Sequence, residues 1–242
     1  MSELIASTER LAGKLRNLEF SPPVACVYRT LDYTWDAHHL YLKRFGAGEK
    51  RVVFLGMNPG PFGMTQTGVP FGEVAAVRDW MGIEAAIGKP DPEHPKRPVE
   101  GFQCQRSEVS GRRLWGLFAE RFENAATFFQ DHFVLNYCPL VWMSATGANL
   151  TPDKLPAAEM AAVEQACLIH LQEVIKLLKP SWLIGVGSFA EERLRRAAAA
   201  SGSTAAIGRI LHPSPASPAA NRGWAEAAGK QLAALGVWPE WR

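Results

Sequence analysis

Four short apolar runs mark the chain, and each is rich in β-branched, aromatic or other apolar residues. They cover residues 51–57, 132–137, 182–186 and 205–211. A near-continuous apolar run without polar alternation is typical of a strand that is buried on both faces of a parallel sheet. We therefore predict a four-stranded, mostly parallel sheet.

Longer segments with apolar residues every three or four positions separate most of these runs, as expected for helices that cover a sheet. The first places Leu4, Leu11, Leu15 and Leu18 on one face, after Ser2, which is able to cap a helix. The others span residues 33–45, 71–81, 109–121, 156–178, 187–200 and 219–235. This alternation predicts a right-handed, doubly wound α/β sandwich, organised as a single domain over residues 1–242.

The composition is ordinary for a globular chain. Its 242 residues are 47% apolar and 21% charged, which is enough to bury a sizeable core. The formal charge of +2 neither demands nor excludes a polyanionic partner. No apolar stretch reaches the about 18 residues of a membrane span. The first residues also lack the basic and apolar regions of a secretion signal. We expect an intracellular protein without a membrane partner.

The four cysteines are widely separated along the chain, at Cys26, Cys104, Cys138 and Cys167. No C-x-x-C pair is present, so neither a zinc site nor an iron-sulfur cluster has its usual ligand spacing. We predict buried, reduced thiols and no bound metal.

Unusual polar residues and glycines follow the predicted strands. They are Asn58, Asn136, the turn at residues 185–187, and the run His212-Pro213-Ser214-Pro215. Ligands of an open α/β sheet bind outside the carboxyl ends of its strands, so these residues should meet in one cleft. Each also has a structural interpretation: Asn58 as a turn residue, Asn136 as a satisfied buried amide, and His212 as the end of a strand.

Residues 185–190 match the dinucleotide fingerprint G-x-G-x-x-A, between a predicted strand and a helix. The acidic residue that should end the next strand is missing, because residues 204–212 contain none. The match therefore indicates a tight strand-to-helix turn, or a helix N-terminus that contacts a DNA phosphate. No cofactor is predicted.

Several longer motifs resemble the single-strand-selective monofunctional uracil-DNA glycosylases. They are Gly56-Met57-Asn58-Pro59-Gly60, the segments 67–73, 93–98, 107–111, 136–140 and 149–152, and His212-Pro213-Ser214-Pro215. The resemblance implies the uracil-DNA glycosylase fold, a three-layer αβα sandwich around a four-stranded sheet. It also implies a monomer that flips uracil or 5-hydroxymethyluracil out of single- or double-stranded DNA. The base is then removed without lyase cleavage and without a cofactor.

The resemblance also implies roles for individual residues. Asn58 would position the attacking water and His212 would stabilise the departing base. The base itself would stack on Phe71 and be recognised by Asn136. Gly60 and Met64 would form the wall beside C5 of the base. Met57 lines the same pocket or belongs to the core.

A proline-rich loop after His212 suits a wedge that enters the DNA stack. Its predicted contacts are Pro213, Ser214, Pro215, Ala216, Ser217 and Arg222. Ala216 stands where relatives carry a large basic residue, so Arg222 is the candidate to compensate. The densest basic region comprises Lys96, Arg97, Arg106, Arg112 and Arg113, which suits either phosphate contact or a solvated face.

The alternative to an enzyme is a nucleic-acid-binding module that has kept the fold without catalysis. The presence of both Asn58 and His212 favours a hydrolase.

Overall fold

The computed structural model describes residues 2–239. Its strands are β1 (Cys26–Arg29), β2 (Val52–Gly56), β3 (His132–Asn136), β4 (Leu140–Met143), β5 (Asn149–Leu150), β6 (Trp182–Val186) and β7 (Ala206–Ile210). Its helices are α1 (Ser2–Leu15), α2 (Thr30–Tyr33), α3 (Trp35–Phe45), α4 (Met64–Thr67), α5 (Val109–Arg121), α6 (Ala125–Asp131), α7 (Ala157–Leu178), α8 (Ser188–Ser201) and α9 (Trp224–Ala234). Shorter helical turns are η1 (Ala76–Trp80), η2 (Gly101–Gln103), η3 (Pro152–Lys154) and η4 (Ala220–Arg222).

The main sheet has four parallel strands in the order β3-β2-β6-β7. These are the four predicted strands, each present to within one residue at either end. The register sets Gly56 at the end of β2 opposite Asn136 at the end of β3. Because β2 is the first of these four strands along the chain and has later strands on both sides, the connections diverge there, which favours a cleft at the carboxyl edge.

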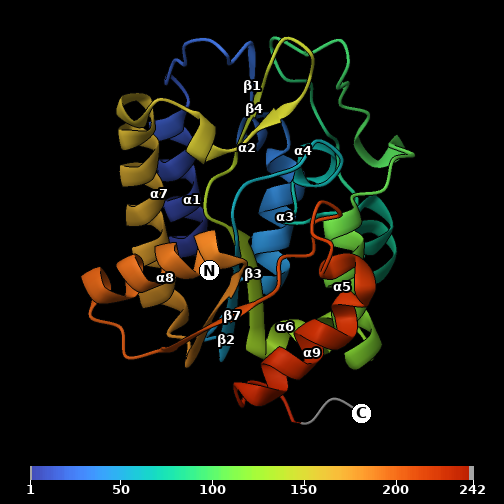
Figure 1. Ribbon diagram of the computed structural model, residues 1–242, viewed down its shortest axis with the longest axis vertical. Helices are drawn as coiled ribbons and strands as arrows, with labels where there is room; N and C mark the ends of the chain where they lie inside the picture. The colour runs from blue at the N-terminus through green and yellow to red at the C-terminus, as the bar shows by residue number, and fades with distance from the viewer. Residues whose placement is uncertain (1, 240–242) are drawn as a thin grey trace.

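Helices cover both faces of this sheet and give the predicted αβα sandwich (Figure 1). On one face α8 packs against the strands, and α7 packs against both α8 and α1. On the other, α5 packs against α9 and α6 lies against β3. In Figure 1 the first group is on the left and the second on the right.

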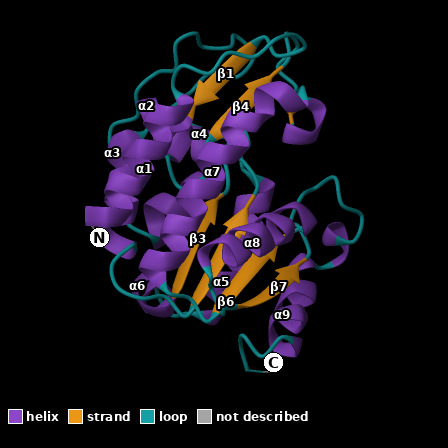
Figure 2. Cartoon of the chain, turned by 90° about the vertical axis from the view of Figure 1, so that its left-hand side faces the viewer, coloured by secondary structure: helices purple, strands orange, loops and turns teal. Residues whose placement is uncertain are grey.

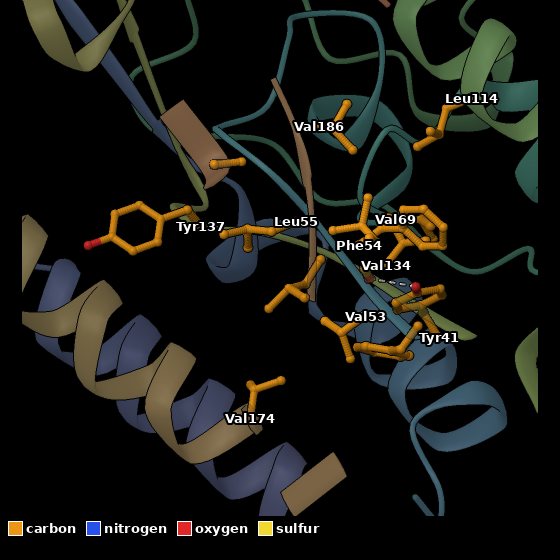
Figure 3. Close-up of a cluster of buried hydrophobic side chains, with 14 of the residues drawn as sticks. Tyr41, Val53, Phe54, Leu55, Val69, Leu114, Val134, Tyr137, Val174 and Val186 are labelled. Carbon is orange, nitrogen blue, oxygen red and sulfur yellow. Dashed lines mark hydrogen bonds between the residues drawn. The ribbon is translucent and has the colours of Figure 1, made fainter. Parts of the chain in front are cut away.

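The core between these layers is formed by the strand residues and the helix faces that cover them (Figure 3). Val53, Phe54 and Leu55 of β2 are completely buried. Tyr41 of α3 is also buried, and its hydroxyl donates a hydrogen bond to the carbonyl oxygen of Val134 at 2.7 Å. Its one polar group is therefore satisfied, as burial among apolar side chains requires.

A second, antiparallel sheet was missing from the sequence-based prediction. Its strands lie in the order β1-β4-β5, above the carboxyl ends of the parallel strands in Figure 2. Both β1 and β4 are four residues long, and β4 is buried throughout, so neither shows a clear alternation of polar and apolar positions.

Some predicted helix boundaries are wrong. The segment 71–81 is helical only from residue 74 and ends in the π-helical turn η1, whereas Phe71 has a left-handed backbone with φ +53°. The segment 219–235 is divided by Gly223, whose φ of +109° separates η4 from α9. Leu18 lies beyond the end of α1 but still packs against the core.

All four cysteines are free and buried, as predicted. Within residues 2–239, no group of three or more histidine, cysteine or acidic side chains is arranged to hold a metal ion. Among the helices described, none combines the length and the apolar character needed to cross a membrane.

His132, at the start of β3, is buried as a neutral side chain. Its Nδ1 bonds to the carbonyl oxygen of Phe128 at 2.9 Å, and Trp238 Nε1 donates to its Nε2 at 3.0 Å. Since Trp238 can only donate, Nε2 must remain unprotonated. Burial lowers the pKa of His132 from 6.5 to about 4.

We therefore expect acid to destabilise the fold as the pH falls from 6.5 toward 4. Over that range the unfolded chain binds a proton at this position before the folded chain does, so stability is fully present above pH 6.5 and declines below it. His132→Gln keeps an acceptor for Trp238 without a titratable ring. Urea unfolding from pH 7 to 4.5 should show a dependence on pH that is shallower by up to about 1.4 kcal/mol per pH unit in the variant. If the free energy of unfolding depends on pH equally in the wild type and in the variant, His132 is not the origin of that dependence.

Candidate active site

An open cleft of about 460 Å³ lies at the carboxyl edge of the parallel sheet. That volume is in the range of about 300–1,000 Å³ that is typical of small-ligand sites. Its lining comes from four parts of the chain: residues 57–64 with Phe71, the end of β3 with β5, residues 107–110 before and within α5, and the segment after β7. Asn58, Asn136 and His212 thus meet in one cleft. The turn at residues 185–187 is not part of its lining.

Asn58 is held by one end of its amide. Its Nδ2 donates to the carbonyl oxygen of Leu140, the first residue of β4, at 3.2 Å. The small antiparallel sheet therefore helps to orient this side chain. With Nδ2 engaged, the Oδ1 atom is left as an acceptor.

His212 is held in a corresponding way. The backbone N–H of Ser214 donates to its Nδ1 at 3.1 Å, so in the neutral ring the proton is on Nε2. Burial lowers the pKa of His212 below its ordinary value of 6.5, which keeps the ring neutral at pH 7. The backbone of Gly187 approaches closely, since a Cβ at that position would lie 3.2 Å from the Cβ of His212. The Nε2–H group of His212 is thus left as a hydrogen-bond donor for a molecule in the cleft.

Phe71 is held in a backbone conformation that a bulky residue rarely adopts, with φ +53°. Such a residue costs of order 1–3 kcal/mol and persists only where its surroundings enforce it. The buried Trp115 donates from Nε1 to the carbonyl oxygen of Phe71 at 3.1 Å. A Cβ at Gly111 would lie only 2.0 Å from that same oxygen, so α5 can approach only because this position is glycine.

The end of β2 lies beneath Asn136 and Phe71. A Cβ at Gly56 would be 2.5 Å from both the Asn136 Oδ1 and the Phe71 ring, so these two groups pack directly on the glycine backbone. The Asn136 Nδ2 lies 3.6 Å from the Met64 sulfur. The amide, the ring and the thioether thus form one corner of the cleft.

A half-buried acid that was missed from the sequence, Glu108, supports the turn that contains Gly60 and Gly63. Glu108 is the N-cap residue of α5, but its side chain makes no capping hydrogen bond. Cβ atoms at Gly60 and Gly63 would lie 2.6 and 3.0 Å from the Glu108 side chain. Burial raises the pKa of Glu108. In the sequence, an acidic residue just before a predicted helix indicates only an N-cap. Its contact with the turn at residues 60–63 is a tertiary contact that the sequence does not reveal.

Of the other residues predicted to contact the base or the DNA, some line the cleft and others lie outside it. Met57 lines the cleft, which favours the pocket over the core. Ser214 and Pro215 also line it, whereas Pro213, Ala216, Ser217 and Arg222 do not. Lys96 is exposed. Arg97 donates to the carbonyl oxygen of Gly147 at 2.9 Å and lies 5.7 Å from the ring centre of Phe62, at the cleft.

Comparison with known proteins agrees with this geometry. Residues 43–233 match the model of the uracil DNA glycosylase superfamily. The structure is also similar to a crystal structure of SMUG2 from Pedobacter heparinus, with a TM-score of 0.65, 17% identity, and coverage of 96% of this chain and 97% of that one. The chain therefore has the fold of the uracil DNA glycosylase superfamily.

Sequence identity narrows the assignment. The chain is 47% identical to the single-strand selective monofunctional uracil-DNA glycosylase of Rattus norvegicus, over 95% of this chain and 83% of the rat protein. It is 46% identical to the corresponding protein of Bos taurus, over 95% of this chain and 85% of the bovine protein. The chain belongs to the family of single-strand selective monofunctional uracil-DNA glycosylases.

Gly56→Ala should damage the cleft and the fold together, because the added methyl group meets Asn136 and Phe71 at 2.5 Å. We expect a loss of about 1–3 kcal/mol in the free energy of unfolding, together with loss of base release in the assay described below. Gly116→Ala is the matched control, since a Cβ there has nothing within 4 Å. That change within α5 should stabilise the protein by up to about 1 kcal/mol. Equal effects of the two substitutions in urea unfolding would contradict the packing described.

Proposed function

We propose that this protein removes uracil and 5-hydroxymethyluracil from single- and double-stranded DNA and leaves an abasic site without cutting the strand. The observation that carries this proposal is the pairing of Asn58 and His212 in one cleft. Each has its other polar atom engaged by the backbone, so that an acceptor and a donor remain for the substrate. The names of the relatives, which describe uracil-DNA glycosylases, agree with it.

In this proposal Asn58 positions the attacking water. The bond between the base and C1′ breaks first, with its electron pair leaving on N1 of the base, and the sugar becomes an oxocarbenium ion. Water held at Asn58 Oδ1 then adds to C1′ and loses a proton to solvent. An amide is sufficient because the cation needs no strong base, so the contribution is one of placement.

His212 stabilises the departing base. Its Nε2–H donates a hydrogen bond to O2 of uracil, where negative charge develops as the bond breaks. A preorganised donor of this kind contributes about 3–4 kcal/mol to transition-state stabilisation. The ring acts in its neutral form, in keeping with the burial that lowers the pKa of His212.

Phe71 and Asn136 hold and recognise the flipped base. Stacking on the Phe71 ring contributes about 1–3 kcal/mol and does not distinguish one base from another. The amide of Asn136 distinguishes uracil from other bases, because it can donate to O4 and accept from N3–H of uracil. Cytosine presents the opposite pattern of donor and acceptor at these positions.

The wall formed by Gly60 and Met64 governs substituents at C5. Both residues line the cleft, and Glu108 supports the turn that contains Gly60. A water molecule at this wall can be replaced by the hydroxyl of 5-hydroxymethyluracil, which makes similar hydrogen bonds. The methyl group of thymine displaces the same water without replacing those bonds, so thymine is disfavoured.

The loop after His212 is the part that enters the DNA stack. Ser214 and Pro215 reach the cleft, and Arg222 lies further along an exposed segment. Ala216 offers little volume to occupy the space left by the flipped base. We therefore infer that uracil is released from duplex DNA less readily than from single strands, with Lys96, Arg97 and Arg222 contacting the phosphates.

Asn58→Ala and His212→Ala should each abolish most of the activity. The first removes the acceptor for water and the second the donor to O2, and we expect losses of about 100-fold to 1,000-fold in the single-turnover rate. The measurement is release of uracil from a single-stranded oligonucleotide, detected as strand scission that appears only after alkali. Wild-type protein that binds the oligonucleotide without forming abasic sites would identify a binding module instead. Wild-type rates in both variants would refute the residue roles.

Phe71→Ala should slow release of every substrate base by a similar factor. A lost stacking contribution of about 1–3 kcal/mol corresponds to roughly 5-fold to 150-fold. The measurement compares single-turnover rates on uracil and 5-hydroxymethyluracil in matched oligonucleotides, with circular dichroism to confirm the fold. A variant that loses only the discrimination between bases, at an unchanged rate on uracil, would show that Phe71 does not act as the stacking surface.

A further inference from the structure

We propose that Arg113 is a positioning residue, which acts through one peptide group to hold His212 in the form that donates from Nε2. The inference rests on the proposed role of His212. In the sequence, Arg113 belongs to the densest basic region, which suits either phosphate contact or a solvated face. The structure instead directs its guanidinium group at the loop that follows His212.

The contacts of Arg113 are specific and convergent. From the first half of α5, its Nη1 donates to the carbonyl oxygen of Pro213 at 2.9 Å and lies 3.4 Å from that of Ser214. Its Nη2 donates to the side-chain oxygen of Asn221 at 2.8 Å. The Asn221 Nδ2 in turn donates to the carbonyl oxygen of Pro215 at 2.9 Å. One guanidinium group thus ties together both ends of the loop 213–222.

The decisive feature is the peptide bond between Pro213 and Ser214. Its carbonyl oxygen accepts from Arg113, and its N–H donates to Nδ1 of His212 at 3.1 Å. Because a peptide group is planar, fixing its oxygen also fixes the direction of its N–H. A cationic donor at the oxygen polarises the group and strengthens the N–H as a donor. The ring is then held with Nδ1 as acceptor and the proton on Nε2.

This arrangement separates two roles that an arginine near DNA can have. A phosphate contact contributes to affinity and to the dependence of binding on salt. A positioning role acts on the rate of the chemical step, because it sets which nitrogen of His212 carries the proton. The neighbouring Arg112 is exposed, lies on the same helix and has the same charge, so it is the natural comparison.

The test compares Arg113→Met with Arg112→Met on a single-stranded uracil oligonucleotide. For Arg113→Met we expect a single-turnover rate at saturating enzyme at least about tenfold below that of Arg112→Met, because the His212 donor is no longer fixed. The slope of log Kd against log salt should stay at the wild-type value. A slope reduced by about one phosphate contact with an unchanged rate would overturn the proposal and assign Arg113 to the DNA backbone.

Nitrogen-15 NMR of the His212 ring supplies a readout that mere loss of stability would not move. In the wild type the proton should reside on Nε2, and in Arg113→Met a substantial fraction should move to Nδ1. Unchanged ring signals together with a wild-type rate would overturn the proposal. This spectrum requires no substrate, so a wild-type protein that releases no uracil would defeat the proposed function and leave the inference about Arg113 testable.

Two further variants keep the test decisive if Arg113→Met fails to fold. Arg113→Lys keeps the charge but lacks the planar fork that reaches Pro213 and Asn221 together, so its rate should be intermediate. Asn221→Ala changes an exposed residue and removes one anchor of the loop, so it should lower the rate in the same direction. Wild-type rates in both folded variants would overturn the proposal.

Discussion

The register between β2 and β3 is the constraint on which the site depends. It sets Gly56 opposite Asn136, and the glycine leaves space for the amide and for the ring of Phe71. A shift of one residue would turn every side chain of the strand to the other face and remove this arrangement. The same strand ends just before Asn58, so the two amides of the cleft, Asn58 and Asn136, are placed by a single pair of strands.

The two polar side chains with proposed roles in catalysis are held in the same way. Asn58 and His212 each have one atom bonded to the backbone, which leaves the other atom with a defined chemical character. Both groups are neutral, and the side chain of Glu108 packs against the turn that contains Gly60 and Gly63. Preorganisation of this kind suits a reaction that needs donors and acceptors in fixed places, because little reorganisation accompanies the charge that develops.

Much of the framework could be predicted from the sequence. Buried parallel strands are nearly continuous in hydrophobicity, so their limits were found to within one residue, and their polar ends located Asn58, Asn136 and His212. The strands β1 and β4 were missed because each is only four residues long, which is too short for a clear periodic signal. The conformation of Phe71 was also missed, because it depends on Trp115 and Gly111, which are distant in sequence. The engagement of Arg113 is likewise a tertiary contact that local charge does not reveal.

Helix α5 contacts nearly every part of the cleft. Glu108 at its start supports one wall, Gly111 and Trp115 fix the backbone of Phe71, and Arg113 holds the loop that follows His212. Because one helix holds all three parts, their relative positions depend on a single element. A shift of this one helix would therefore change the place of the aromatic ring and of the imidazole together.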